Sequence, residues 1–210
     1  MGQPNLANPE YKQAKKADLE MLEMSQREGL IHLKYLDESG FRLESGVSYG
    51  WIRRGIQKCI EQPKKRGTRI SILGLLERGK SFVYGLVTGG FRGKKYIEMM
   101  NEEADRAKRK MIETGCITVV VLDNYILHKS KMVKEYWASW EAAGLYFFFL
   151  PPYSAEMNRI EDEWHQLKNH ELAGRSYEDE YELVKGIIEG VKERGIRKGY
   201  ITERYIFNPA

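Results

Sequence analysis

Two short, wholly apolar runs in the second half of the chain constrain its fold more than any other feature. Residues 117–122 read ITVVVL and residues 146–150 read YFFFL, and a helical pattern over 129–143 separates them. Continuous apolar runs of this length are typical of strands buried on both faces, as in parallel sheets covered by helices. The sequence therefore predicts an α/β fold in which these two strands lie parallel.

The rest of the chain supplies the other elements of a mixed sheet. Further strands are predicted over 31–36, 69–76 and 81–88, with a short extended piece over 47–53. Helices are predicted over 8–29, 94–114, 129–143, 158–172 and 178–194. We expect five strands, with the hairpin 69–88 antiparallel to the central strand 31–37 and the two apolar strands parallel to it on the other side. Helices should cover both faces.

The composition sets wide limits on function. Lys and Arg number 34 against 30 Asp and Glu, so a net charge of +4 allows a nucleic-acid partner without requiring one. Cys59 and Cys116 lie far apart, which argues against a disulfide scaffold or a zinc ribbon and favours a reducing compartment. No apolar run approaches the roughly 20 residues of a membrane helix, and the first residues lack a signal peptide's apolar core. We therefore expect a cytoplasmic protein without membrane contact.

Residues 74–81, GLLERGKS, match the phosphate-binding pattern GxxxxGK[ST]. That loop needs a helix beginning at its Lys-Ser end, so that backbone amides can hold the phosphate. The residues that follow, FVYGLVT, are typical of a strand instead. We therefore interpret the match as a hairpin turn. An NTPase that uses this loop is the alternative, and ATP binding lost on Lys80→Ala would reveal it.

Three acidic residues stand where predicted strands end or a helix begins. Asp37 follows the strand 31–36, Asp123 follows the strand 117–122, and Glu161 lies in the first turn of the helix after 146–150. The carboxyl ends of neighbouring parallel strands face a common crevice, where three carboxylates repel one another unless cations hold them. Such a site suits Mg²⁺ or Mn²⁺, and two such ions can activate an attacking oxygen and stabilise a leaving one.

Each acid also has a plainer interpretation. Residues 37–40, DESG, make a good turn. Asp123 can cap a loop by bonding its own backbone, and Asn158-x-x-Glu161 has the shape of a capping box. These readings compete with a catalytic role for each residue taken singly.

Helical geometry narrows the third position without settling it. An apolar stripe is formed by Ile160, Trp164 and Leu167. Glu161 and Glu163 flank the stripe on its two sides, and periodicity does not choose between them. Glu161 shares its flank with His165 and Lys168, which could reach a phosphate backbone or form a solvated helix face.

Four segments resemble the catalytic domain of bacterial insertion-sequence transposases related to the mariner elements: LDESGF (36–41), YGWIRRG (49–55), VVVLDNYILHKS (119–130) and LPPYSAEMNRIEDEWHQLK (150–168). The resemblance covers residues from about 30 to 172 in matching order. It implies an RNase H-like fold and a DDE endonuclease. By this resemblance Asp37, Asp123 and Glu161 are the catalytic carboxylates that hold two Mg²⁺ or Mn²⁺ ions, and Asn124 and His128 match a polar pair beside the second acid.

The chain departs from the family in one motif. The family usually has Leu-Asn-Pro before the glutamate, whereas this chain has Met157-Asn158-Arg159. Loss of the proline removes a pre-set φ from the first helical position, and Arg159 can offer a phosphate contact instead. We expect an N-terminal helical extension over 1–30, a DDE catalytic domain over 31–175 and a C-terminal helical tail over 176–210.

The resemblance implies divalent-metal-dependent DNA strand cleavage and strand transfer at transposon ends. A catalytically inactive, domesticated transposase that binds DNA or regulates is the alternative. We expect transposon ends and target DNA as partners, a homo-oligomer when active, and a location near the bacterial nucleoid. Only 36 residues precede Asp37, so we expect a separate helix-turn-helix region or polypeptide to find the ends.

DNA contacts are expected from basic residues that supply phosphate contacts without reading sequence. We therefore predict weak, salt-sensitive and largely sequence-indifferent DNA binding by this chain alone. The residues expected to make these contacts are Lys168, His165, Arg159, Lys64, Lys65 and Arg66.

Overall fold

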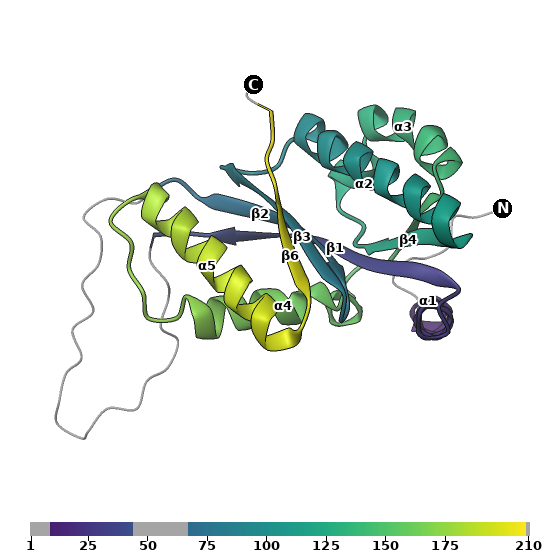
Figure 1. Cartoon of the computed structure of the whole chain (residues 1–210), viewed down its shortest axis with the longest axis horizontal. Coiled ribbons are helices and arrows are strands. Elements are labelled where there is room, and N and C mark those ends of the chain that lie inside the picture. The colour runs from purple at the N-terminus through teal and green to yellow at the C-terminus, as the bar shows by residue number, and fades with distance from the viewer. Residues whose placement is uncertain (1–8, 44–66, 209–210) are drawn as a thin grey trace, which may run out of the picture.

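The structure, a computed structural model, describes residues 9–43 and 67–208 and shows one mixed sheet with helices on both faces (Figure 1). The strand order is β5-β4-β1-β2-β3-β6. The strands are β1 Ile31–Phe41, β2 Ile70–Glu77, β3 Ser81–Thr88, β4 Ile117–Leu122, β5 Leu145–Phe149 and β6 Ile201–Tyr205. The α-helices are α1 Pro9–Arg27, α2 Gly93–Thr114, α3 Lys131–Ala142, α4 Ile160–Gln166 and α5 Glu180–Lys198.

The predicted topology of the central strands is confirmed. β1 lies antiparallel to β2, and β2 to β3, while β4 and β5 run parallel to β1 on its other side. Three short helical turns complete the chain: η1 Ile126–Lys129, η2 Ala155–Met157 and the π turn η3 Leu167–Glu171, which continues α4. Gly115 ends α2 in the left-handed conformation, at φ 74°, as a C-terminal glycine should. The extended piece predicted over 47–53 lies outside the described residues.

The central strand β1 is longer than predicted, and the turn interpretation of residues 37–40 is wrong. β1 pairs with β2 from Tyr35↔Leu76 to Phe41↔Ile70, so the antiparallel partner holds these residues extended. The parallel partner β4 accompanies only the first half of β1, from Ile31↔Ile117 to Tyr35↔Val121. Asp37 therefore lies in the middle of a strand, two residues past the end of its parallel pairing.

The sheet has a sixth strand that the sequence analysis missed. β6 pairs parallel with β3, from Ser81↔Ile201 to Gly85↔Tyr205, and closes that edge of the sheet. Its sequence, ITERY, is short and charged, and its side chains are exposed or only half-buried. It therefore lacks the apolar alternation that marks a strand. The range 176–210, predicted as a helical tail, contains this strand as well as α5.

The phosphate-loop alternative is wrong, and the hairpin interpretation of residues 74–81 is confirmed. The turn between β2 and β3 is closed by a 3.0 Å hydrogen bond from the Lys80 N–H to the Glu77 carbonyl, with Gly79 at φ 71°. Ser81 begins β3 rather than a helix. The amide cradle that binds phosphate therefore does not form here.

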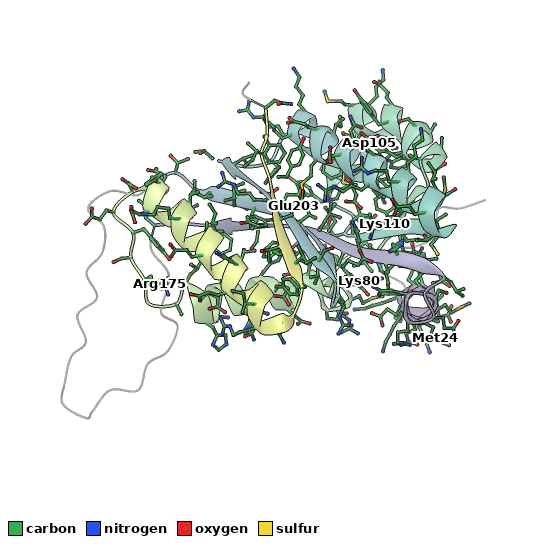
Figure 2. All side chains as sticks on the ribbon, viewed as in Figure 1. Met24, Lys80, Asp105, Lys110, Arg175 and Glu203 are labelled. Atoms are coloured by element: carbon green, nitrogen blue, oxygen red, sulfur yellow. The ribbon has the colours of Figure 1, made fainter. Side chains whose placement is uncertain are left out.

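Each face of the sheet has its own core (Figures 1 and 2). Helices α1, α4 and α5 cover one face, around Leu19, Trp164 and Ile187. Helices α2 and α3 cover the other, around Met100 and Trp140. None of the described helices is both long and apolar enough to cross a membrane. The division into 1–30, 31–175 and 176–210 stays a prediction.

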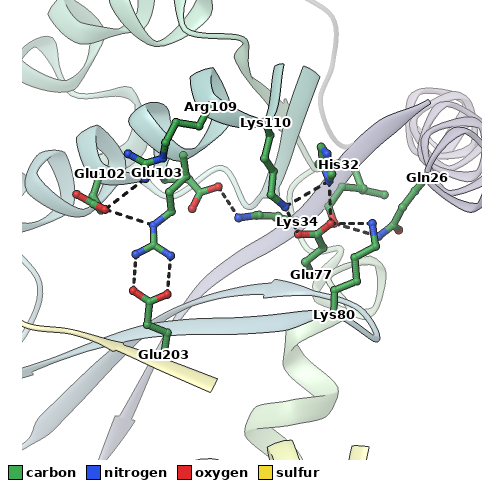
Figure 3. A network of polar contacts seen from close by, with 12 residues as sticks. Gln26, His32, Lys34, Glu77, Lys80, Glu102, Glu103, Arg109, Lys110 and Glu203 are labelled. Carbon is green, nitrogen blue, oxygen red and sulfur yellow. Dashed lines mark hydrogen bonds and ion pairs between the residues drawn. The ribbon is translucent and has the colours of Figure 1, made fainter. Parts of the chain in front are cut away.

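A polar network joins α2 to the sheet on the face away from α4 (Figure 3). Lys34 of β1 and Glu103 of α2 form a 2.5 Å ion pair, and both side chains are buried. Beside it, the buried Glu77 carboxylate contacts His32, Lys80 and Lys110 at 3.0 to 3.1 Å. Burial acts to raise the pKa of Glu77, but His32 and Lys110 outweigh it and lower that pKa to about 2. This network fixes the position of α2 on the sheet.

Candidate active site

Three elements bring the predicted carboxylates together. Asp37 stands in β1, Asp123 follows β4 directly, and Glu161 lies in the first turn of α4. The last parallel pair is Tyr35↔Val121, so Asp37 and Asp123 each lie two residues further along neighbouring strands. All three acids line one cleft of about 290 Å³.

The pKa shifts of the three acids differ in direction and cause. Burial, and then the charge of Glu161, raise the pKa of Asp37 to about 7, with a further contribution from Asp123. Burial also raises the pKa of Glu161, with Asp123 adding to the shift and Lys168 opposing it. Burial acts to raise the pKa of Asp123 too, but hydrogen bonds from His128 and the Tyr125 N–H outweigh it and lower that pKa. Ionising all three acids together is therefore unfavourable without cations.

Trp164 holds Asp37 in place. Its indole Nε1–H donates a 2.9 Å hydrogen bond to Asp37 Oδ2. The indole passes over Gly74, where a Cβ would lie 2.7 Å from Trp164 Cη2. The sequence analysis placed Trp164 only on an apolar stripe and missed this contact. The available signal was that a buried tryptophan N–H usually finds a hydrogen-bond partner.

The side chain of Asp123 is held by residues that follow it in the sequence. The Tyr125 N–H donates a 3.0 Å hydrogen bond to Asp123 Oδ1, and His128 Nε2 lies 3.3 Å from the same oxygen. His128 is buried, with its ring centroid 4.9 Å from that of Tyr96. Asn124 makes other contacts: its side-chain amide donates a hydrogen bond to the Leu150 carbonyl, and its Oδ1 accepts one from Lys129. Asn124 therefore ties the end of β4 to the end of β5.

The structure distinguishes Glu161 from Glu163. Glu163 Oε2 accepts hydrogen bonds from Arg194 Nε at 2.6 Å and from the Tyr200 hydroxyl at 2.9 Å, on the side away from the acids. Glu161 lines the cleft with Asp37 and Asp123. Of the two flanking glutamates, only Glu161 is therefore placed to act with the other acids.

The capping-box interpretation of residues 158–161 is wrong. Asn158 is buried, and its Nδ2 donates a 3.0 Å hydrogen bond to the Leu36 carbonyl, one residue before Asp37. Its Oδ1 has no hydrogen-bond partner within the described part of the chain. Asn158 thus ties the start of α4 to β1 instead of capping the helix.

The predicted basic residues separate into two groups. Lys168 lines a second cleft of about 710 Å³, which shares Asp37 and Glu161 with the first and also contains Arg42 and Arg69. His165 and Arg159 line another cleft, beside Arg194 and away from Asp37. The structure therefore brings only Lys168 to the acids, although helical spacing had put His165 on the same flank. The predicted contacts at Lys64, Lys65 and Arg66 lie outside the described residues.

The chain has a six-stranded mixed sheet with a central antiparallel hairpin and helices on both faces, and it carries acids where β1 and β4 part. This architecture is that of the RNase H-like class. The chain belongs to a family within it: the family model described as DDE superfamily endonuclease matches residues 32–184. No curated protein resembles the chain closely enough in sequence to match it.

Solved structures of Mos1 transposase share the fold. The catalytic domain of Mos1 mariner transposase is 15% identical, with a TM-score of 0.56, and the match covers 94% of this chain and 95% of that one. The Mos1 catalytic domain with Raltegravir and Mg is 16% identical, with a TM-score of 0.59 and coverage of 91% and 90%. The Mos1 paired-end complex with the left transposon end is 14% identical, with a TM-score of 0.59. The match covers 95% of this chain, which spans 64% of the length of that transposase.

Proposed function

We propose that this chain is the catalytic domain of a DNA transposase, which performs divalent-metal-dependent strand cleavage and strand transfer at transposon ends. The observation that carries this proposal is the convergence of Asp37, Asp123 and Glu161, from three separate elements, on one cleft. Membership of the DDE superfamily endonucleases supports it. The Mos1 structures, with a transposon end in one case and Mg in another, support DNA and a divalent ion as partners.

The donor set at the cleft fits hard divalent cations. Three carboxylates supply the oxygen ligands that Mg²⁺ and Mn²⁺ prefer. Burial is the main cause of the raised pKa of Asp37, and the charges of Glu161 and Asp123 add to it. Among the described residues, no group of three His, Cys, Asp or Glu side chains is already arranged to hold an ion.

Asp37, Asp123 and Glu161 would hold two Mg²⁺ or Mn²⁺ ions. When bound, such ions lower the pKa of an attacking oxygen and neutralise charge on the leaving oxygen of a phosphodiester. The chain's own residues orient the ligands. The Trp164 N–H fixes one oxygen of Asp37, and the Tyr125 N–H and His128 hold Asp123 in its ionised form.

The larger cleft supplies a path for the DNA backbone. It runs from Asp37 and Glu161 along the second half of β1, and its cationic side chains are Arg42, Arg69 and Lys168. Guanidinium and ammonium groups bind phosphate without reading sequence. We place one DNA strand in this cleft, with its scissile phosphate at the acids.

The decisive experiment is strand cleavage with Mg²⁺ on DNA that carries the element's own ends. Asp37→Asn, Asp123→Asn and Glu161→Gln should each lose cleavage by orders of magnitude. Asp162→Asn is the matched control, because Asp162 lies next to Glu161 on α4 and is exposed. Wild-type cleavage by Glu161→Gln would contradict the assignment of that residue. DNA binding without cleavage by the unmodified chain would favour the inactive, regulatory alternative.

Recognition of the ends by a separate helix-turn-helix region or polypeptide, and a homo-oligomer as the active form, belong to the same proposal. A mobility-shift titration at physiological salt, comparing terminal repeats with scrambled DNA, tests the first of these. We expect similar and weak affinity for both. A preference for the repeats above roughly a hundredfold would place specific recognition in this chain.

A further inference from the structure

The outer edge of β5 offers backbone groups for pairing. β5 pairs only with β4 and stands at the end of the strand order. The Leu150 N–H, directly after β5, donates a 2.9 Å hydrogen bond to the Leu122 carbonyl of β4. Backbone groups alternate in direction along a strand, so those of Phe147 and Phe149 point away from β4. Within the described part of the chain they have no hydrogen-bond partner.

The sequence of β5 leaves this edge open. β5 reads LYFFF and has neither a charge nor a proline of its own. Tyr146 is 40% exposed, and the three phenylalanines after it are half-buried. The other edge strand, β6, reads ITERY, and its Glu203 forms an ion pair with Arg106. Charged residues in an edge strand usually prevent a further strand from adding to it. β6 has this protection and β5 does not.

Three lysines from other elements line the same edge. Lys15 of α1 has its Nζ 4.3 Å from the centroid of the Phe148 ring, and Lys129 of η1 has its Nζ 4.4 Å from that of Phe149. Burial lowers the pKa of Lys129, and the charges of Lys134 on α3 and of Lys15 add to this shift. The three ammonium groups therefore lie close enough to repel one another.

These lysines flank β5 on both faces of the sheet. The Phe148 ring packs against the core beneath α1, and the Phe149 ring packs against the core beneath α3. A strand added beside β5 would direct two consecutive side chains to these two faces, because side chains alternate along a strand. In the part of the chain that the structure describes, none of the three lysines has an ion pair with a carboxylate. Two consecutive acidic residues would supply the missing counter-charges.

We propose that the outer edge of β5 binds an extended, acidic peptide segment of a partner protein, which adds to the sheet as a further strand. Main-chain hydrogen bonds to Phe147 and Phe149 would supply affinity, and the lysines would select acidic residues opposite Phe148 and Phe149. Neither cleft that contains the acids includes β5 or these lysines, so the proposal does not depend on the proposed function.

Two other occupants suit this edge less well. A second copy of the chain would bring its own three lysines to the same edge, because a two-fold interface pairs a surface with itself. A nucleic acid would match the lysines, but it has no peptide backbone to continue the sheet. An acidic strand satisfies both the charges and the backbone groups.

The test uses the ¹⁵N-labelled chain and the synthetic peptide acetyl-TVTEETVT-amide, which reads the same in both directions and so fits a parallel or an antiparallel strand. We expect saturable binding that slows hydrogen exchange at the Phe147 and Phe149 amides, because these point outward. Amides of β6 should exchange equally fast with and without the peptide. A fully N-methylated peptide keeps both charges but cannot pair as a strand, so it should not bind.

Charge reversal tests the lysines. The double variant Lys15→Glu, Lys134→Glu should bind the peptide roughly tenfold more weakly or worse, and it should prefer acetyl-TVTKKTVT-amide instead. This exchange of preference requires a folded protein, so misfolding does not imitate it. Lys192→Glu is the matched control, because Lys192 is an exposed lysine on α5, which lies away from α1 and α3 (Figure 1). It should bind the acidic peptide as the wild type does.

Several results would overturn the proposal. One is a failure of the acidic peptide to bind, and another is binding that survives N-methylation or the double charge reversal. Slow exchange of the Phe147 and Phe149 amides that depends on protein concentration, without peptide, would assign the edge to a second copy. Protection of these amides by a single-stranded oligonucleotide but not by the peptide would assign it to nucleic acid. Strand cleavage is not measured in this test, so the proposed function stands or falls separately.

Discussion

Asp37 shows how one buried carboxyl group connects stability with function. Its pKa is raised from 3.8 to about 7, so in the metal-free protein its ionisation opposes folding. The stability that its protonated form contributes is fully present below pH 3.8 and is lost as the pH rises through 7. Asp37→Asn keeps an oxygen acceptor for Trp164 and removes the charge. We predict that this variant is more stable than the wild type at pH 8, by on the order of 2–4 kcal/mol.

Urea unfolding at pH 3.5 and pH 8, with chelator present, measures this difference. The two proteins should be nearly equal in stability at the lower pH. Asp162→Asn should stay within about 0.5 kcal/mol of the wild type at both values, because Asp162 is exposed. An Asp37→Asn protein that is no more stable at pH 8 would show that this carboxyl group is not strained by burial and by Glu161.

At the scale of elements, Gly74 sets the distance between the sheet and α4. A Cβ at this position would lie 2.7 Å from the Trp164 indole and 2.8 Å from the Phe82 ring, so Gly74→Ala must displace one of them. We predict a loss of about 1–3 kcal/mol in unfolding free energy, typical of overpacking, together with a fall in cleavage because Trp164 positions Asp37. Gly90→Ala is the control, since a Cβ there meets nothing within 4 Å. An unperturbed Gly74→Ala protein would mean that Trp164 moves freely.

The docking of α2 depends on the buried pair Lys34–Glu103. Removing one partner leaves the other charge buried and uncompensated, so Glu103→Ala should cost about 3–5 kcal/mol. Replacing both with apolar residues removes both charges, and the double variant Lys34→Met, Glu103→Leu should recover most of that loss. Denaturant unfolding of the wild type and of these two variants measures both differences. If the double variant is as unstable as Glu103→Ala, the loss in Glu103→Ala does not come from an uncompensated buried charge.

For the whole molecule, local pattern predicted the topology of five strands and the placement of Asp37 and Asp123 on neighbouring strands, whereas the choice of Glu161 came from the family resemblance. Local pattern failed where contacts between residues far apart in the sequence determine the structure. Helical periodicity left Glu161 and Glu163 equivalent, and the choice comes from Arg194, 31 residues beyond Glu163. The extension of β1 through Asp37 follows from pairing with β2, which overrides the turn propensity of Asp-Glu-Ser-Gly. The strand β6 has too little apolar surface for its sequence to reveal it.

Whether the molecule unfolds as one unit depends on how residues 176–210 are joined to the rest of the fold. Ile187 of α5 is fully buried in the core that contains Trp164, while Trp140 lies in the core on the other face of the sheet. Because one sheet separates and supports both cores, we predict a single cooperative transition. Ile187→Ala should lower stability by about 2–5 kcal/mol and shift the transitions of Trp140 and Trp164 together.

Fluorotryptophan NMR during denaturation resolves the two signals. Ile196→Ala, at a position on α5 that is 74% exposed, should change neither. A shift confined to Trp164 would mean that residues 176–210 form a separable tail.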